Sequence, residues 1–253
     1  MPLLPPIYIN TVVAIGMENE KKEKSWIGTG FCFGKAVDTN VELSKRQYFI
    51  WIITNKHVLE GKKDVIIKVN SSDSISSKDY PIKLINENGQ QIWTGHRDKE
   101  IDVAVLFINP KVLVNEKMTH NFFQSDIHIL QKKKLKELMV SEGDRIFALG
   151  FPMGLVDIKR HYVICRGGCI ARIKSCLDNR SKDFLIDAFV FPGNSGGPVI
   201  LCPASISLEG TNVIKNSYLI GIKIIYTIYR YSYKPANRCS KNSFSREYWF
   251  FFS

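Results

Sequence analysis

FPGNSGGPVI, residues 191 to 200, places one serine, Ser195, among three glycines and two prolines, directly before an apolar run. Glycines on both sides let the backbone adopt conformations that residues with a Cβ avoid. Such a loop can turn the N–H groups of Gly193 and Ser195 toward one point, as an acyl-transfer reaction needs for its oxyanion. The stretch therefore marks Ser195 as a candidate nucleophile and both residues as candidate oxyanion-hole donors.

A serine hydroxyl needs an adjacent base, and usually a carboxylate that orients this base, before it attacks a carbonyl. His57 lies in the stretch ITNKHVLEG at the end of the apolar run YFIWII, where a rigid strand can hold it. We interpret the other four histidines as ordinary surface or core residues; they are His96, His120, His128 and His161.

Asp102 is the favoured acid because it opens the apolar run DVAVLFI after the polar stretch HRDKEI. A carboxylate at the start of a strand can be half buried and aimed at an imidazole nitrogen. Asp64 and Asp98 are the competing choices, and neither leads into so strong an apolar strand.

The order of these residues along the chain separates the hydrolase folds. GNSGG also fits the G-x-S-x-G loop of α/β-hydrolases, whose histidine follows the serine. No histidine follows Ser195, which excludes that fold. The order Asp, His, Ser is formally open through Asp38, but the subtilisin fold needs alternating helices and parallel strands, which this chain lacks. The order His, Asp, Ser on two β-barrels remains.

Short β-branched and aromatic runs, separated by turn residues, predict strands along most of the chain. Many short strands split by one linker suggest an all-β protein of two barrel-like halves. The predicted parts are an N-terminal barrel (1–112) with His57 and Asp102, a linker with a short helix (113–139), a C-terminal barrel (140–233) with Ser195, and a basic aromatic tail (234–253). The predicted strands are YINTVVAI, WIGTGFCFG, YFIWIIT, DVIIKV, YPIKLI, QQIWT, DVAVLFI, RIFALGF, HYVICRG, CIARIKS, DFLIDAFVF, GPVIL and YLIGIKIIY.

Composition points to an ordinary globular protein. The chain has 253 residues with 45% hydrophobic and 23% charged side chains, and it contains no run of about 18 apolar residues that would span a membrane. The start, MPLLPPIYIN, lacks the basic region and uninterrupted apolar segment of a signal peptide. We therefore expect a cytoplasmic protein whose six cysteines are reduced thiols.

Metal and nucleic-acid sites are weakly indicated. His161, Cys165, Cys169 and Cys176 could be drawn as a zinc site, but CRGGC is not the usual two-residue knuckle and the segment alternates like a hairpin. The net charge of +11 comes from scattered basic residues with no recognition motif. We predict no metal, no cofactor and no specific nucleic-acid partner.

Six segments together resemble the chymotrypsin-like serine peptidases, and most closely the trypsin-like HtrA/Deg group. They are GTGF (28–31), TNKHV (54–58), DVAVL (102–106), GFPMG (150–154), DAFVFPGNSGGPV (187–199) and LIGI (219–222). The resemblance implies two six-stranded antiparallel β-barrels with the active site in the cleft between them. It also implies His57 as general base and acid, Asp102 as its orienting carboxylate and Ser195 as nucleophile. The PDZ domain common in HtrA-like proteins has no room in the roughly 20 residues after the last predicted strand.

Three positions depart from the family pattern. Asn194 stands where zymogen-activated relatives carry an aspartate, so that activation route is not expected. Ile224 takes a place where relatives often have a hydroxyl residue near the triad aspartate. The implied substrate pocket, formed by Phe189, Val190, Phe191 and Ile224, offers no acid, so we expect apolar side chains rather than lysine or arginine in the substrate.

The predicted function is a serine endopeptidase that cleaves polypeptides through an acyl-enzyme. The alternative is a catalytically weak or inactive trypsin-like module that acts as a binding protein, which Ile224 favours. A basic protein for nucleic acid or membrane surfaces has only the net charge in its favour. The sequence leaves the oligomeric state open, and it is compatible with an activating partner.

Overall fold

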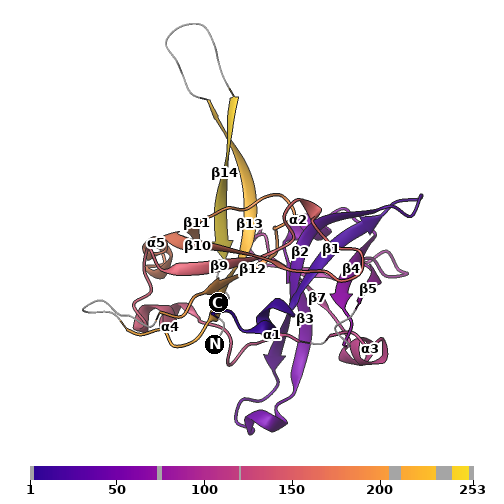
Figure 1. Ribbon diagram of the computed structural model, residues 1–253, viewed down its shortest axis with the longest axis horizontal. Helices are drawn as coiled ribbons and strands as arrows, with labels where there is room; N and C mark the ends of the chain where they lie inside the picture. The colour runs from indigo at the N-terminus through magenta and orange to yellow at the C-terminus, as the bar shows by residue number, and fades with distance from the viewer. Residues whose placement is uncertain (1–2, 73–75, 120, 205–211, 232–240, 251–253) are drawn as a thin grey trace, which may run out of the picture.

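The computed structural model describes the backbone of residues 3–72, 76–119, 121–204, 212–231 and 241–250, with side chains as far as residue 223. Two curled sheets lie side by side, one built from the first half of the chain and one from the second (Figure 1). Among the described residues no helix is long or apolar enough to span a bilayer.

The first sheet joins eight strands, with β5, β4, β1, β2, β3, β7 and β6 as successive neighbours and β8 paired to β2. All neighbours are antiparallel except β8, which runs parallel to β2. The strands are β1 Val12–Glu18, β2 Lys24–Ala36, β3 Tyr48–Thr54, β4 Asp64–Asn70, β5 Ser77–Lys83, β6 Thr94–Gly95, β7 Ala104–Phe107 and β8 Phe123–Gln124. The helical turns are α1 Pro6–Ile9, η1 Leu43–Lys45, α2 Lys56–Leu59 and α3 Pro110–Asn115.

The second sheet closes into a barrel in the order β10, β11, β14, β13, β12, β9. Its strands are β9 Arg145–Gly150, β10 Ile164–Arg172, β11 Asp183–Ala188, β12 Pro198–Leu201, β13 Tyr218–Tyr231 and β14 Lys241–Phe250. Its helical turns are α4 Lys132–Glu137, η2 Pro152–Gly154 and α5 Lys174–Leu177.

The all-β fold of two barrels is confirmed, although the first sheet has eight strands where the sequence predicts six. The excess comes from β6 and β8, which have two residues each. The second barrel has the predicted six strands, but its sixth, β14, lies inside residues 234–253, which the sequence assigns to a tail. The predicted boundaries of the parts stay a prediction.

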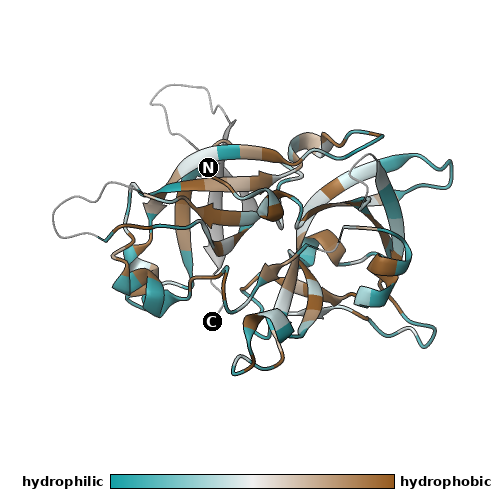
Figure 2. Cartoon of the chain, turned by 60° about the horizontal axis from the view of Figure 1, so that its bottom comes forward, coloured by the Kyte–Doolittle hydropathy of each residue, from teal (hydrophilic) through white to brown (hydrophobic). Residues whose placement is uncertain are grey.

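Apolar side chains form three clusters, one inside each barrel and one between them. The central cluster contains Phe31 and Ile53 from the first barrel and Phe151, Ile200 and Leu219 from the second. Figure 2 shows these apolar segments on the strands of both lobes, with hydrophilic residues concentrated in peripheral loops. Full burial of one such large side chain stabilises the fold by about 1.5–3 kcal/mol, so the central cluster holds the barrels together.

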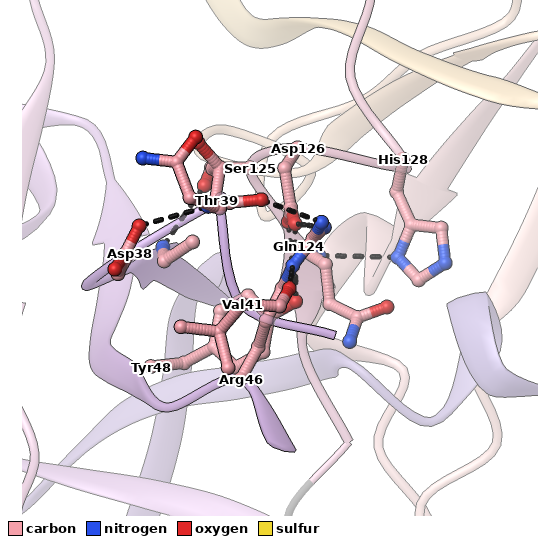
Figure 3. Close-up of polar contacts among 11 residues, drawn as sticks. Asp38, Thr39, Val41, Arg46, Tyr48, Gln124, Ser125, Asp126 and His128 are labelled. Atoms are coloured by element: carbon pink, nitrogen blue, oxygen red, sulfur yellow. Dashed lines mark hydrogen bonds and ion pairs between the residues drawn. The ribbon is translucent and has the colours of Figure 1, made fainter. Parts of the chain in front are cut away.

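The connector between the barrels is tied to the first barrel by polar contacts (Figure 3). Arg46 forms an ion pair with Asp126, and the Tyr48 hydroxyl also contacts this carboxylate. The Ala36 N–H donates to the Ser125 hydroxyl at 3.1 Å. Burial, followed by the nearby Asp126 charge, raises the pKa of Tyr48. These contacts fix where the chain leaves the first barrel.

Candidate active site

His57 is placed by the end of β3. The β-branched run of β3 stops at Thr54, and the short helix α2 follows after Asn55. Val58 and Leu59 are buried and anchor this helix, while the His57 side chain is 46% exposed. The imidazole is therefore held on a short helix with buried anchors and stays partly open to solvent.

Asp102 reaches His57 because β7 pairs with β3, with Ala104 opposite Thr54. One carboxylate oxygen, Oδ2, lies 2.5 Å from His57 Nδ1, and Oδ1 accepts the His57 backbone N–H at 3.1 Å. The Asn55 side chain donates to the Asp102 carbonyl at 2.6 Å. Since a carboxylate only accepts, Nδ1 carries the proton and Nε2 is left as the basic nitrogen.

The Ser195 loop consists of two successive tight turns. Asn194 N–H donates to Phe191 O at 3.1 Å, and Gly197 N–H donates to Asn194 O at 3.0 Å. Gly193 and Gly196, each third in its turn, have φ of +94° and +86°. This pattern is typical of type II turns, which need glycine at the third position. The sequence therefore dictates a tight loop that presents Ser195 between two left-handed residues.

Two N–H groups of this loop have no acceptor among the described residues. Within the described part of the chain, neither Gly193 N–H nor Ser195 N–H donates a hydrogen bond, whereas those of Asn194, Gly196 and Gly197 do. Donors left open beside a nucleophile are what an oxyanion hole requires.

The serine loop lies against the end of β3 from which His57 follows. A Cβ on Gly196 would meet Thr54 Oγ1 at 2.3 Å, and one on Gly28 would meet the Val58 side chain at 2.7 Å. Ser195 itself is 5% exposed. In the described residues no hydrogen bond joins the Ser195 hydroxyl to His57, and such contacts often form only with substrate bound.

The predicted pocket residues fall into different environments. Phe189 is 78% exposed, Val190 is buried, and the Arg166 guanidinium lies over the Phe191 ring at 5.2 Å from its centre. The side chain of Ile224 lies outside the described residues. Sequence reasoning missed Arg166, and nothing in its local sequence signals this contact.

None of the competing candidates among the described residues contacts His57. Asp98 pairs with Lys182, and Asp64 starts β4 on an exposed position. His96 accepts the Asp98 N–H. His120 lies outside the described residues.

Of two further histidines, His161 is buried and His128 is partly buried. Burial lowers the pKa of His128, and it lowers that of His161 to about 4. The described residues contain no group of three or more His, Cys, Asp or Glu side chains able to hold a metal ion.

Residues 28–203 match the model of the trypsin-like peptidase domain. Among solved structures, the chain is similar to neuropsin, a serine protease expressed in the limbic system of mouse brain, with 13% identity, a TM-score of 0.44, and coverage of 98% of this chain and 92% of that one. No curated protein matches the chain. Because the family model spans more than half of the sequence, the chain belongs to the trypsin-like peptidase domain family.

Proposed function

We propose that this protein is a serine endopeptidase that hydrolyses peptide bonds through an acyl-enzyme. The observation that carries the proposal is the His57–Asp102 pair, with Oδ2 2.5 Å from Nδ1, on the strand end that the Ser195 loop packs against. The family membership implies polypeptide substrates. The HtrA-like subgroup, the cytoplasmic location and an activating partner stay predictions.

In the proposed first step, the Ser195 oxygen attacks the substrate carbonyl carbon while its proton passes to His57 Nε2. The carbonyl oxygen becomes an oxyanion, which accepts hydrogen bonds from the N–H groups of Gly193 and Ser195. Asp102 stabilises the imidazolium that forms. Collapse of the tetrahedral intermediate breaks the C–N bond, and the leaving amine takes the proton from Nε2.

In the second step, water attacks the acyl-enzyme ester with His57 again as the base. The water proton passes to Nε2 and then to the Ser195 oxygen as the ester bond breaks, which releases the carboxylic product and restores the serine. No cofactor takes part in this scheme.

A binding module with weak or no turnover is the second candidate. One observation favours it, since no hydrogen bond joins Ser195 to His57 among the described residues. Such a module keeps the fold of both barrels and fails to activate the serine.

Labelling with a fluorophosphonate probe separates the two candidates. The parent should label, while Ser195→Ala and His57→Ala should not, because the probe reacts only with an activated serine. Ser44→Ala and His96→Ala are controls of the same residue types, since both side chains are exposed. A folded parent that does not label would overturn the enzyme proposal and support the binding module.

A further inference from the structure

Thr29 lies in β2 between two glycines and is fully buried. Its hydroxyl donates to Gly193 O at 2.7 Å, and its backbone N–H donates to Ser195 O at 2.8 Å. These carbonyls belong to the same two residues whose N–H groups lack an acceptor in the described chain. One residue of the first barrel thus holds both ends of the candidate oxyanion loop, which belongs to the second barrel.

Two further hydrogen bonds fix Thr29 itself. The Phe151 N–H donates to Thr29 Oγ1 at 3.1 Å, and the Thr54 hydroxyl donates to Thr29 O at 2.7 Å. Phe151 and Thr54 are both fully buried. Thr29 therefore joins the end of β3, which precedes His57, to the loop that carries Ser195.

Gly193 has φ of +94° and is closely packed, since an added Cβ would lie 2.5 Å from Phe151 O. Two hydrogen bonds hold the Gly193–Asn194 peptide, because its carbonyl accepts from the Thr29 hydroxyl and its N–H donates to Phe191 O. Rotation of this peptide would break both bonds and leave a partly buried carbonyl without a partner, which is unfavourable. The hydroxyl therefore holds the loop in the conformation that leaves the two N–H groups open.

We propose that Thr29 is a positioning residue that keeps the Gly193 and Ser195 N–H groups available to the oxyanion. This inference rests on the proposed peptidase function and adds a residue that touches neither substrate nor reacting atoms. Only a hydroxyl serves here, because Thr29 Oγ1 donates to Gly193 O and accepts from Phe151 N–H at the same time. Serine preserves both bonds, and valine preserves the shape while removing both.

The test compares Thr29→Val and Thr29→Ser with the parent in fluorophosphonate labelling over a range of probe concentrations. Thr11→Val is the matched control, since Thr11 is equally buried and its hydroxyl donates to Tyr8 O at 2.7 Å. Circular dichroism gives the folded fraction of each variant. Hydrogen exchange of the peptide that covers residues 189–199 reports on the loop without any need for activity.

We expect Thr29→Val to lower the maximal labelling rate by about 10- to 100-fold, with little change in the half-saturating probe concentration, because a displaced donor loses part of its oxyanion stabilisation. Thr29→Ser should restore labelling to within about three-fold of the parent. Exchange in the 189–199 peptide should accelerate in Thr29→Val only.

Three results overturn the inference. They are a folded Thr29→Val variant that labels like the parent, an equal loss in Thr11→Val, and unchanged exchange in the 189–199 peptide of Thr29→Val. A parent that fails to label overturns the proposed function instead, and the exchange measurement then still decides whether Thr29 holds the loop.

Discussion

Replacing Gly196 by alanine is expected to displace the serine loop from the first barrel. An added Cβ would lie 2.1 Å from Thr29 O and 2.3 Å from Thr54 Oγ1, and real contacts of this kind essentially never fall below 3.0 Å. Thr29 and Thr54 are fully buried, so the loop must move by roughly 1 Å to relieve the overlap. A misplacement of about 1 Å costs on the order of 100-fold in rate. The fluorophosphonate labelling rate of Gly196→Ala should fall by this factor.

Strain in the backbone must be separated from displacement of the loop. Gly196 has φ of +86°, where alanine costs about 1–2 kcal/mol. Gly89 has φ of +77° and no atom within 4 Å of an added Cβ, so Gly89→Ala introduces comparable strain without a clash. Urea unfolding should show a loss of stability in both variants, while only Gly196→Ala loses labelling. A folded Gly196→Ala variant that labels within about three-fold of the parent would refute the reasoning.

Two further outcomes follow from the described contacts. Asp102→Asn removes the acceptor from His57 Nδ1, so the labelling rate should fall by about 10³- to 10⁴-fold. The control variant Asp98→Asn should label at the rate of the parent. Equal labelling rates for the two variants would contradict the role of Asp102. His161 should make the fold less stable in acid. Burial lowers its folded-state pKa from 6.5 to about 4, so His161 takes up a proton at a higher pH in the unfolded chain than in the folded one. The full contribution of neutral His161 to the free energy of unfolding should be present above pH 6.5, and on the order of 3 kcal/mol of it should be lost toward pH 4. Urea unfolding of His161→Gln should show a smaller loss over the same pH range. An identical loss in parent and variant would exclude His161 as the cause.

Most of the architecture could be predicted from local patterns, because alternating and β-branched residues favour strands wherever a face is buried. The runs YFIWIIT and RIFALGF coincide with β3 and β9 to within a residue. The site residues could be proposed because His57 and Asp102 flank strands that pair, and pairing follows from the apolar pattern of β3 and β7. Their contact is therefore a consequence of strand register.

Other features depend on contacts that a local pattern does not contain. HYVICRG and CIARIKS are predicted as two strands of a hairpin, but the structure has the single strand β10, which pairs continuously with β9 from Ile164 to Cys169. Neither Gly167 nor Gly168 has a positive φ, so the two glycines extend the strand and do not turn it. Most of QQIWT is also not strand, and only Thr94 belongs to β6.

The role of Thr29 depends on contacts between the two barrels, which the local sequence does not contain. The GTGF segment resembles a family pattern, and a hydroxyl residue between two glycines on an apolar strand suggests a buried polar contact. The local sequence does not identify the carbonyl that accepts the Thr29 hydroxyl, because this carbonyl belongs to the second barrel, more than 160 residues away along the chain.

The central apolar cluster and the Thr29 contacts make the candidate active site a joint property of the two barrels. Each half carries only part of the proposed site, with His57 and Asp102 in one half and Ser195 in the other. A chain cut between α3 and β8 should therefore yield two fragments that do not react with the fluorophosphonate probe by themselves. Their reassociation should restore labelling of Ser195. If Ser195 is the nucleophile, the interface that stabilises the fold is also the condition for its reactivity.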